Sequence, residues 1–220
     1  MKKLITIISV LLLAPLFAQG ITTASAYFKT ISERYANIHD YEADFDISVN
    51  GKATSGKLSY RVPDLVRLDY TRPRNQVICY NGEALIAYLP GSAAVLQQTV
   101  DTTASRAARK ATKGLGLLSR YYSVAYETGQ SAVPLYEGSS EMVIKFILYR
   151  RNASETFRHI KIAVNPRSKL IRRIEAVTPN GEKFIFNFYN YRLNQDIPEL
   201  RFIYDPPSDA NVYNNFLYSE

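Results

Sequence analysis

The sequence predicts a mainly β fold, in which a long antiparallel meander of about eleven short strands curls around a few helices. Three observations carry this prediction. Apolar and polar residues alternate with a period of two through most of the chain after residue 41. Turn dipeptides such as Asn81-Gly82 and Asn180-Gly181 separate the alternating segments. The chain has too little helical sequence to cover the whole apolar face, so we expect the sheet to curl rather than stay flat.

The N-terminus has the pattern of a secretory signal peptide. Two lysines precede an uncharged, mostly apolar run over residues 4–17, and small residues follow. We expect cleavage after Gly20, and cleavage after Ala26 also fits the small-residue rule. The remaining alternative is an uncleaved membrane anchor, although the apolar run is short for a span. The sequence thus predicts an exported protein with a signal peptide over residues 1–20 and a single domain over residues 21–220.

The first predicted element is a helix over residues 22–38, where apolar residues recur at helical spacing. Asn81-Gly82 predicts a two-residue hairpin that pairs Tyr80 with Glu83 and Cys79 with Ala84. The expected strands before and around it cover residues 41–49, 56–62, 65–70, 76–80, 83–89 and 94–100. The covered face of the hairpin is expected to carry Val77, Cys79, Ile86 and Tyr88.

Residues 102–122 interrupt the strand pattern. They are rich in Ala, Lys and Arg, and they predict one or two short helices that break near Gly114 and Gly116. Three leucines, at positions 115, 117 and 118, lie together at this break. The remaining strands are expected over residues 142–150, 157–164, 169–178, 182–191 and 200–207.

Residues that commonly perform catalysis are few. The two histidines, His39 and His159, fit surface or sheet positions, and the chain has no nucleophile-elbow, zinc-protease or P-loop motif. The carboxylates of residues 42, 44 and 46 share a strand face that we expect to be solvated. Cys79, the only cysteine, is expected to be inert packing. The sequence therefore predicts a protein that is not an enzyme and that binds no metal or other cofactor.

The chain is basic, with a formal net charge of +7 from 27 basic and 20 acidic residues. Its clusters of basic residues indicate either a solvated surface or attraction to an anionic membrane or an acidic partner. Export argues against nucleic acid as the partner. The clusters are Arg106, Arg109, Lys110 and Lys113 in the helical insert, and the pairs Arg150-Arg151 and Arg172-Arg173.

The long apolar face of the sheet leaves two interpretations open. In one, it is an ordinary core that the helices fill. In the other, the filling moves aside and a lipid takes its place. Periodicity alone is satisfied by either arrangement, because both require one apolar face on every strand.

Residues 56–90, "GKLSYRVPDLVRLDYTRPRNQVICYNGEALIAYLP", resemble the periplasmic lipoprotein carrier family LolA. The shared pattern is a glycine, an alternating strand, a Pro-polar-Leu turn, an aromatic strand, a second turn, a strand, an Asp/Asn-Gly turn and a strand that ends in an aromatic residue and proline. The N-terminal helix followed by "YEADF", and the C-terminal "FIYDPPSDANVY", extend the resemblance over essentially the whole mature chain.

The resemblance implies an unclosed antiparallel β-barrel with helices acting as a lid. It also implies a monomeric periplasmic carrier that shelters the acyl chains of lipoproteins. Such a carrier receives lipoproteins from an inner-membrane ABC transporter and passes them to an outer-membrane acceptor. The lid is expected at Leu115, Leu117 and Leu118, and the lipid cavity is expected to be lined by Leu58, Tyr60, Val62, Val66, Leu68, Tyr70, Val77, Ile86 and Tyr88.

Two positions depart from the family pattern, and at one of them Leu68 replaces the second aromatic residue of the aromatic strand. The other is in the first turn. The family commonly has an arginine directly before the proline of the first turn, where it helps to hold the lid closed. This chain has Val62 there, and Arg61 is expected to point to the other side of the strand. Two other classes of function stay open. A lipid- or lipoprotein-sensing module of the same fold would bind acyl chains without carrying lipoproteins. An enzyme acting on envelope lipids or glycans would need a polar catalytic cluster in the cavity, and we identify none.

Overall fold

The computed structural model describes residues 22–100 and 114–216. Its helices are α1 (Ala24–Ala36) and the short α3 (Leu118–Tyr121), with 3-10 helices η1 (Pro90–Ser92), η2 (Gly114–Leu117) and η3 (Glu199–Phe202). Its strands are β1 (Asp40–Val49), β2 (Lys52–Arg61), β3 (Leu65–Arg72), β4 (Val77–Tyr80), β5 (Ala84–Leu89), β6 (Ala94–Thr99), β7 (Tyr122–Tyr126), β8 (Val133–Pro134), β9 (Met142–Arg150), β10 (His159–Val164), β11 (Ile171–Val177), β12 (Lys183–Leu193) and β13 (Asn211–Asn214).

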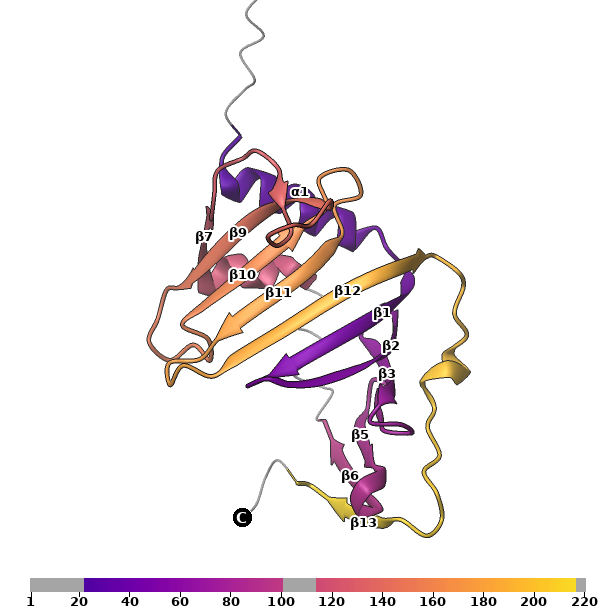
Figure 1. Cartoon of the computed structure of the whole chain (residues 1–220). Helices are drawn as coiled ribbons and strands as arrows, with labels where there is room; N and C mark the ends of the chain where they lie inside the picture. The colour runs from indigo at the N-terminus through magenta and orange to yellow at the C-terminus, as the bar shows by residue number, and fades with distance from the viewer. Residues whose placement is uncertain (1–21, 101–113, 217–220) are drawn as a thin grey trace, which may run out of the picture.

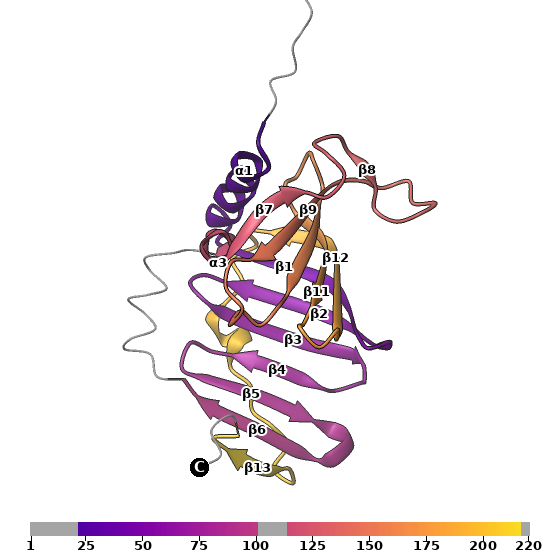
Figure 2. The same ribbon diagram turned by 90° about the vertical axis from the view of Figure 1, so that its left-hand side faces the viewer.

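These strands form one long sheet that does not close on itself. Their order is β13-β6-β5-β4-β3-β2-β1-β12-β11-β10-β9-β7, and β8 pairs with β9 beside this path. The two ends of the path, β13 and β7, lie far apart in Figure 2, and the sheet between them curves. Figure 1 shows α1 lying across the end of the sheet that β7 and β9 to β11 form. The predicted fold, mainly β and unclosed with an N-terminal helix, is confirmed.

Helix α1 forms where the sequence predicts it. The side chain of Thr23 accepts a hydrogen bond from the backbone N–H of Ala26 at 3.2 Å, which satisfies one of the free donors of the first turn. Asn37 ends the helix. Phe28 and Ile31 lie on one side of α1 and are fully buried against the sheet, so the helix covers part of the sheet's apolar face.

The hairpin between β4 and β5 differs from its prediction by two residues. The structure pairs Tyr80 with Leu85 and Cys79 with Ile86, where the sequence predicted Glu83 and Ala84 as partners. The cause is Asn81, whose side-chain oxygen accepts the N–H groups of residues 83 and 84 at 3.0 and 2.8 Å and so builds a longer loop. A shift of two residues keeps every side chain on its expected face.

Three strands lie outside the predicted set, and one predicted strand is wrong. Strands β7, β8 and β13 were not predicted. Residues 200–207, expected as a strand, instead form the end of η3 and an extended segment without ladder partners. β13 pairs with β6 in parallel, at one end of the sheet. The pairing of β13 depends on a contact between distant parts of the chain, and local alternation carries no information about it.

Each face of the sheet is covered in part, and a different part of the chain covers each one. We call the face on which α1 packs the inner face. Its buried cluster joins α1 to β7 and β9 to β11 and includes Phe28, Ile31, Ile144, Phe146, Leu148, Ile160 and Ile162. We call residues 194–210 the C-terminal strap, which crosses the outer face. Ile197 and Phe202 of the strap are buried there with Val77 and Cys79.

Candidate functional site

The inner face of β1 to β5 presents apolar side chains in rows that run across the strands. Direct pairing aligns Tyr41, Tyr60, Val66 and Tyr80 in one row. The next row holds Ala43, Leu58, Leu68, Ile78 and Ala87 and contains no polar side-chain atom. Helix α1 packs on the other end of the sheet, and the inner-face side chains of β2 to β5 are half-buried. This part of the inner face is therefore an apolar surface that remains partly exposed.

Tyr41 lies at the centre of a cluster of four tyrosines at one end of this surface. Its ring centroid is 6.4 Å from that of Tyr35 on α1, 5.1 Å from that of Tyr60 on β2 and 5.7 Å from that of Tyr191 on β12. Burial raises the pKa of the Tyr41, Tyr35 and Tyr191 hydroxyls above the ordinary value of about 10, at which tyrosine is already protonated at neutral pH.

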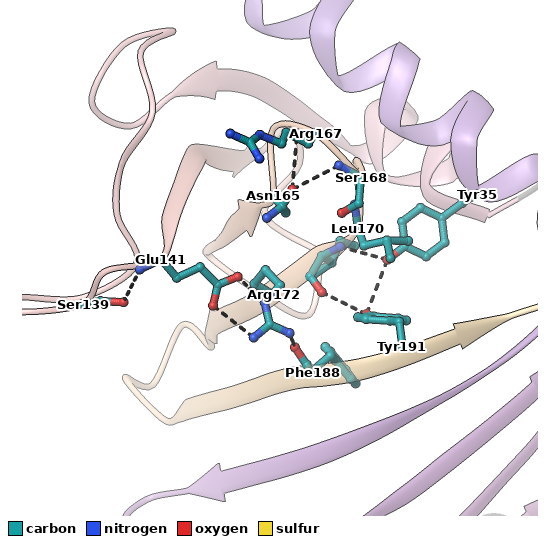
Figure 3. A network of polar contacts seen from close by, with 11 residues as sticks. Tyr35, Ser139, Glu141, Asn165, Arg167, Ser168, Leu170, Arg172, Phe188 and Tyr191 are labelled. Carbon is teal, nitrogen blue, oxygen red and sulfur yellow. Dashed lines mark hydrogen bonds and ion pairs between the residues drawn. The ribbon is translucent and has the colours of Figure 1, made fainter.

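The hydroxyls of Tyr35 and Tyr191 are held by the backbone of β11, as Figure 3 shows. The N–H of Ile171 donates to the Tyr35 hydroxyl, and the Tyr191 hydroxyl donates to the Ile171 carbonyl, both at 2.9 Å. Arg172, the next residue, donates to the Phe188 carbonyl on β12 and forms an ion pair with Glu141. These contacts fix α1 and β12 against the start of β11.

A bulge brings Tyr191 to the inner face. The pairing of β1 with β12 shifts between Glu42 and Asp44, and Asn190 adopts a left-handed backbone with φ 54° at this point. Strict alternation over residues 182–191 does not reveal the shift, so the sequence analysis missed the contact of Tyr191 with Tyr41. Asparagine tolerates the left-handed region and was the one available signal.

The outer face of β3 carries the polar contacts that hold the C-terminal strap. Arg67 donates to the backbone carbonyls of Arg201 and Ile203, each at 3.2 Å, and its guanidinium carbon lies 5.3 Å from the ring centroid of Tyr204. Asp69 accepts hydrogen bonds from both Arg67 and Arg201. The strap therefore has charge-assisted bonds as well as apolar contacts.

The nine expected cavity residues fall into two groups. By pairing, Leu58, Tyr60, Val66, Leu68 and Tyr70 lie on the inner face, and Val62 lies at the end of β2 with 40% of its surface exposed. Val77, Ile86 and Tyr88 share the outer face, where Val77 packs with the strap and the Tyr88 ring lies 6.3 Å from that of Tyr204. Tyr70 also lines a hollow with Val77 and Tyr88, at the edge between the two groups. Strand pairing places Val77, Ile86 and Tyr88 on the face opposite to Leu58, Tyr60, Val66 and Leu68.

Arg61 points to the outer face, as its position in the strand predicts. It donates to the Ile197 carbonyl of the strap and lies 3.9 Å from the Glu199 carboxylate. It is thus one more attachment of the strap and lies on the side of the sheet opposite to α1.

The leucines expected in the lid lie beside α1. Leu115 in η2 and Leu118 in α3 pack against the inner-face core cluster, and Leu117 is half-buried. The expected basic cluster at Arg106, Arg109, Lys110 and Lys113 lies outside the described residues.

Cys79 and the acidic residues of β1 form hydrogen bonds and ion pairs within the fold. The Cys79 thiol is buried, donates to the Phe202 carbonyl at 3.1 Å, and has a pKa that burial raises. Glu42 pairs with Arg192, and Asp44 accepts a bond from Asn190 at 2.8 Å. Within the described ranges, no group of three or more His, Cys, Asp or Glu side chains is placed to hold a metal ion.

A model of the family described as outer membrane lipoprotein carrier protein LolA matches residues 37–205. The chain belongs to the LolA family. The matched span begins at the residue after α1, includes β1 to β12 and ends in the strap. The family's description is that of a carrier and not of an enzyme. Among the described residues of this LolA-family chain, no helix has the length and hydrophobicity needed to cross a membrane.

Two groups of bacterial proteins are similar to this LolA-family chain. The outer-membrane lipoprotein carrier protein of Bordetella avium strain 197N is 25% identical over 183 residues, which cover 80% of this chain and 82% of the relative. The protein of the same description from Pseudomonas aeruginosa strain UCBPP-PA14 is 21% identical over 160 residues, covering 72% and 71%. Both alignments span most of each protein.

Solved structures with a similar fold have low sequence identity to this chain. An uncharacterized conserved protein from Thermus thermophilus matches with a TM-score of 0.57 at 12% identity, over 87% of this chain and 99% of that one. The crystal structure of MucB matches with a TM-score of 0.51 at 14% identity, over 83% of this chain and 62% of that one. At these identities the likeness shows the fold alone.

Proposed function

We propose that this protein is a periplasmic carrier that binds the acyl chains of lipoproteins on the inner face of its sheet and moves lipoproteins from the inner to the outer membrane. The observation that carries the proposal is the half-buried apolar row of Leu58, Leu68 and Ile78, in a chain of the LolA family. The side chains of this row are hydrocarbon and include no catalytic group, so an acyl chain can make apolar contacts with them.

The energetics of acyl chains require such a surface. Burying hydrocarbon contributes about 0.8 kcal/mol for each CH₂ group, so a lipid anchor with several chains does not cross water unaided. A carrier has to cover the chains and still release them. Half-buried apolar side chains suit this task, because they already pack with one another and leave part of their surface for the ligand.

The lid is the second part of the proposal. Leu115 and Leu118 pack against the same inner-face cluster as α1, next to Gly116. We assign to the segment of residues 114–121 the role of moving aside when acyl chains enter. Glycine allows the required backbone rotation at little steric cost.

The location and partners in the proposal rest on the signal sequence and on the family. We assign the protein to the periplasm, with an inner-membrane lipoprotein-releasing ABC transporter as donor and an outer-membrane protein as acceptor. Mass spectrometry of the mature protein is expected to find an N-terminus near Ile21 in the periplasmic fraction. An intact Met1 in the membrane fraction would contradict this assignment.

Release from membranes is the decisive test of the carrier. Inner-membrane vesicles that contain the transporter and a labelled lipoprotein are incubated with ATP and the purified mature protein. We expect the label to appear in a soluble complex, and mass spectrometry of protein purified from the periplasm to find bound lipoprotein or lipid. A protein that binds lipid but leaves all label in the vesicles is not a carrier.

A second candidate is a lipid- or lipoprotein-sensing module. The observation that favours it is Val62, which stands where the family commonly has the arginine that holds the lid. Arg61 does not replace that arginine, because it is bonded to the strap on the outer face. A sensor binds acyl chains in the same place, so the release assay separates the two candidates.

A further inference from the structure

The Tyr41 hydroxyl differs from the other three hydroxyls of the tyrosine cluster. Those of Tyr35 and Tyr191 bond to the backbone of Ile171, and that of Tyr60 donates to the Pro63 carbonyl at 3.1 Å. Within residues 22–100 and 114–216, the Tyr41 hydroxyl has no hydrogen-bond partner. The Tyr41 ring is nevertheless the central ring, in contact with the rings of all three. Tyr41 is half-buried, and no buried side-chain oxygen or nitrogen of the described residues lacks a hydrogen-bond partner, so the Tyr41 oxygen is reached by solvent.

Tyr41 lies in the row of tyrosines that borders the apolar row of the inner face. Tyr41 begins the cross-strand row that also holds Tyr60 and Tyr80. The adjacent row, which includes Leu58 and Leu68, has no polar side-chain atom. Polarity therefore changes along the inner face, from hydroxyls at the tyrosine end to pure hydrocarbon one row further. A ligand with a polar carbonyl beside long hydrocarbon chains matches this order.

Tyr60 and Tyr80 cannot serve such a ligand without losing a bond. The Tyr60 hydroxyl donates to the Pro63 carbonyl, and the Tyr80 hydroxyl donates to the Gly82 carbonyl at 3.0 Å. A ligand acceptor at Tyr41 breaks no hydrogen bond of this hydroxyl to the described part of the chain and only displaces water from it. An ordinary tyrosine, with a pKa of about 10, is already neutral at physiological pH, and burial raises the pKa of Tyr41 further, so the phenol is a donor there.

We infer that the Tyr41 hydroxyl is the polar anchor of the lipid site and donates a hydrogen bond to an ester carbonyl of a diacylglyceryl group whose acyl chains lie over the Leu58 and Leu68 row. The inference rests on the proposed lipid binding and deepens it. The recognised chemistry is the glycerol ester, which both a lipoprotein anchor and a phospholipid contain. Tyr41 thereby sets the depth to which the acyl chains enter.

The experiment measures how tightly wild-type protein and one variant bind two pairs of ligands. Each pair consists of a diacyl ester and its dialkyl ether analogue, first of a lipopeptide and then of phosphatidylglycerol. Wild-type protein and Tyr41→Phe are titrated with a diacylated lipopeptide and with its dialkyl ether analogue, which lacks only the two ester carbonyls. Displacement of a fluorescent fatty-acid probe reports binding. We expect Tyr41→Phe to bind the ester about fivefold more weakly, or about 1 kcal/mol, and the ether unchanged. This difference between the two ligands is the coupling between the hydroxyl and the ester.

Tyr60→Phe is the matched control, because it removes a hydroxyl of the same cluster that is already bonded within the protein. It is expected to change the affinities for the ester and the ether by the same factor. The comparison of diacyl with dialkyl phosphatidylglycerol then separates the sources. If Tyr41→Phe weakens binding of the ester but not the ether for both the lipopeptide and phosphatidylglycerol, Tyr41 recognises any glycerol ester. If it does so for the lipopeptide alone, Tyr41 recognises lipoproteins.

The outcomes separate this inference from the function on which it rests. Equal losses for ester and ether in Tyr41→Phe, or no loss for either, would overturn the anchor while lipid binding stands. If folded wild-type protein binds none of the four ligands, the proposed function fails and the anchor fails with it. Thermal melts of each variant establish that a loss of affinity is not a loss of fold.

Discussion

Arg67 and Asp69, two residues apart on β3, form an ion pair on the outer face that also holds the strap. Arg67 Nε donates to both carboxylate oxygens of Asp69, at 3.0 and 3.2 Å. The same guanidinium donates to two strap carbonyls, and the same carboxylate accepts from Arg201 of the strap. The strap is thus attached by one connected set of bonds, with Cys79 and Phe202 packed beside it.

Removing Arg67 is expected to loosen the strap and to destabilise the protein. Arg67→Met keeps the length of the side chain but leaves two strap carbonyls and Asp69 without this donor. Hydrogen bonds of charged groups suggest a loss of about 2 kcal/mol in the free energy of unfolding. Denaturant melts measure the loss, and hydrogen exchange is expected to increase over residues 197–204. Arg74→Met, at an exposed turn residue, is the control and should leave both unchanged.

Gly56 is a position where the sheet has no room for a side chain. A Cβ there would clash with the backbone carbonyl of Asp69 and lie 2.8 Å from Cζ of Phe45. Because the first neighbour is backbone, β3 would have to move, so Gly56→Ala is expected to lower the free energy of unfolding by about 1–3 kcal/mol. Gly91→Ala is the matched control, since its Cβ meets nothing within 4 Å. Equal stability of the two variants would contradict this account.

Leu68 tests whether the inner face holds acyl chains. Leu68→Glu places a carboxylate in the row of Leu58 and Ile78, where an ionised group is costly and either protonates or draws in water. We expect binding of a fluorescent fatty-acid probe to weaken by at least about tenfold. Thr99→Glu adds the same charge at an exposed position of β6 and should bind like the parent. A folded Leu68→Glu variant with parental affinity would remove the main physical support for the carrier.

Hydrogen exchange tests the proposed lid. The segment of residues 114–121 packs against the inner-face cluster through Leu115 and Leu118. If it moves aside on loading, its amides exchange faster in the lipid-bound protein, and the change is larger there than in β9 or β10. Equal protection with and without lipid would show that the segment is a fixed part of the core.

His159 makes stability depend on pH. Burial, with the positive charges of Arg158 and Lys161, lowers the pKa of its imidazole below the ordinary value of about 6.5. A lowered folded-state pKa contributes stability that is fully present above the unfolded pKa and is lost as the pH falls through the folded value. Thermal melts are expected to show a falling melting temperature from pH 7 to pH 5.5, and a smaller fall in His159→Gln. An identical pH dependence in the variant would mean that other groups are responsible.

Local patterns in the sequence determined most of the elements. Thr23 as a helix cap and Asn50, Asn81 and Gly181 at turns act within a few residues, so helix α1 and most strands lie where predicted. The residues of the apolar inner row, such as Leu58 and Leu68, also follow from alternation, because a period of two separates the faces of a strand wherever no bulge intervenes.

Tertiary structure alone decided what covers each face. Cys79 donates a hydrogen bond to Phe202, 123 residues away, and the strap packs there on the face of Val77, which is opposite to α1. The bulge that brings Tyr191 beside Tyr41 likewise depends on β12 meeting β1. Alternation states that a strand has an apolar face, but the segment that buries it comes from elsewhere in the chain. Which segment buries a given face depends on how the whole sheet packs. The hydrophobic effect is non-directional, so it favours burial of the face without specifying the segment that covers it.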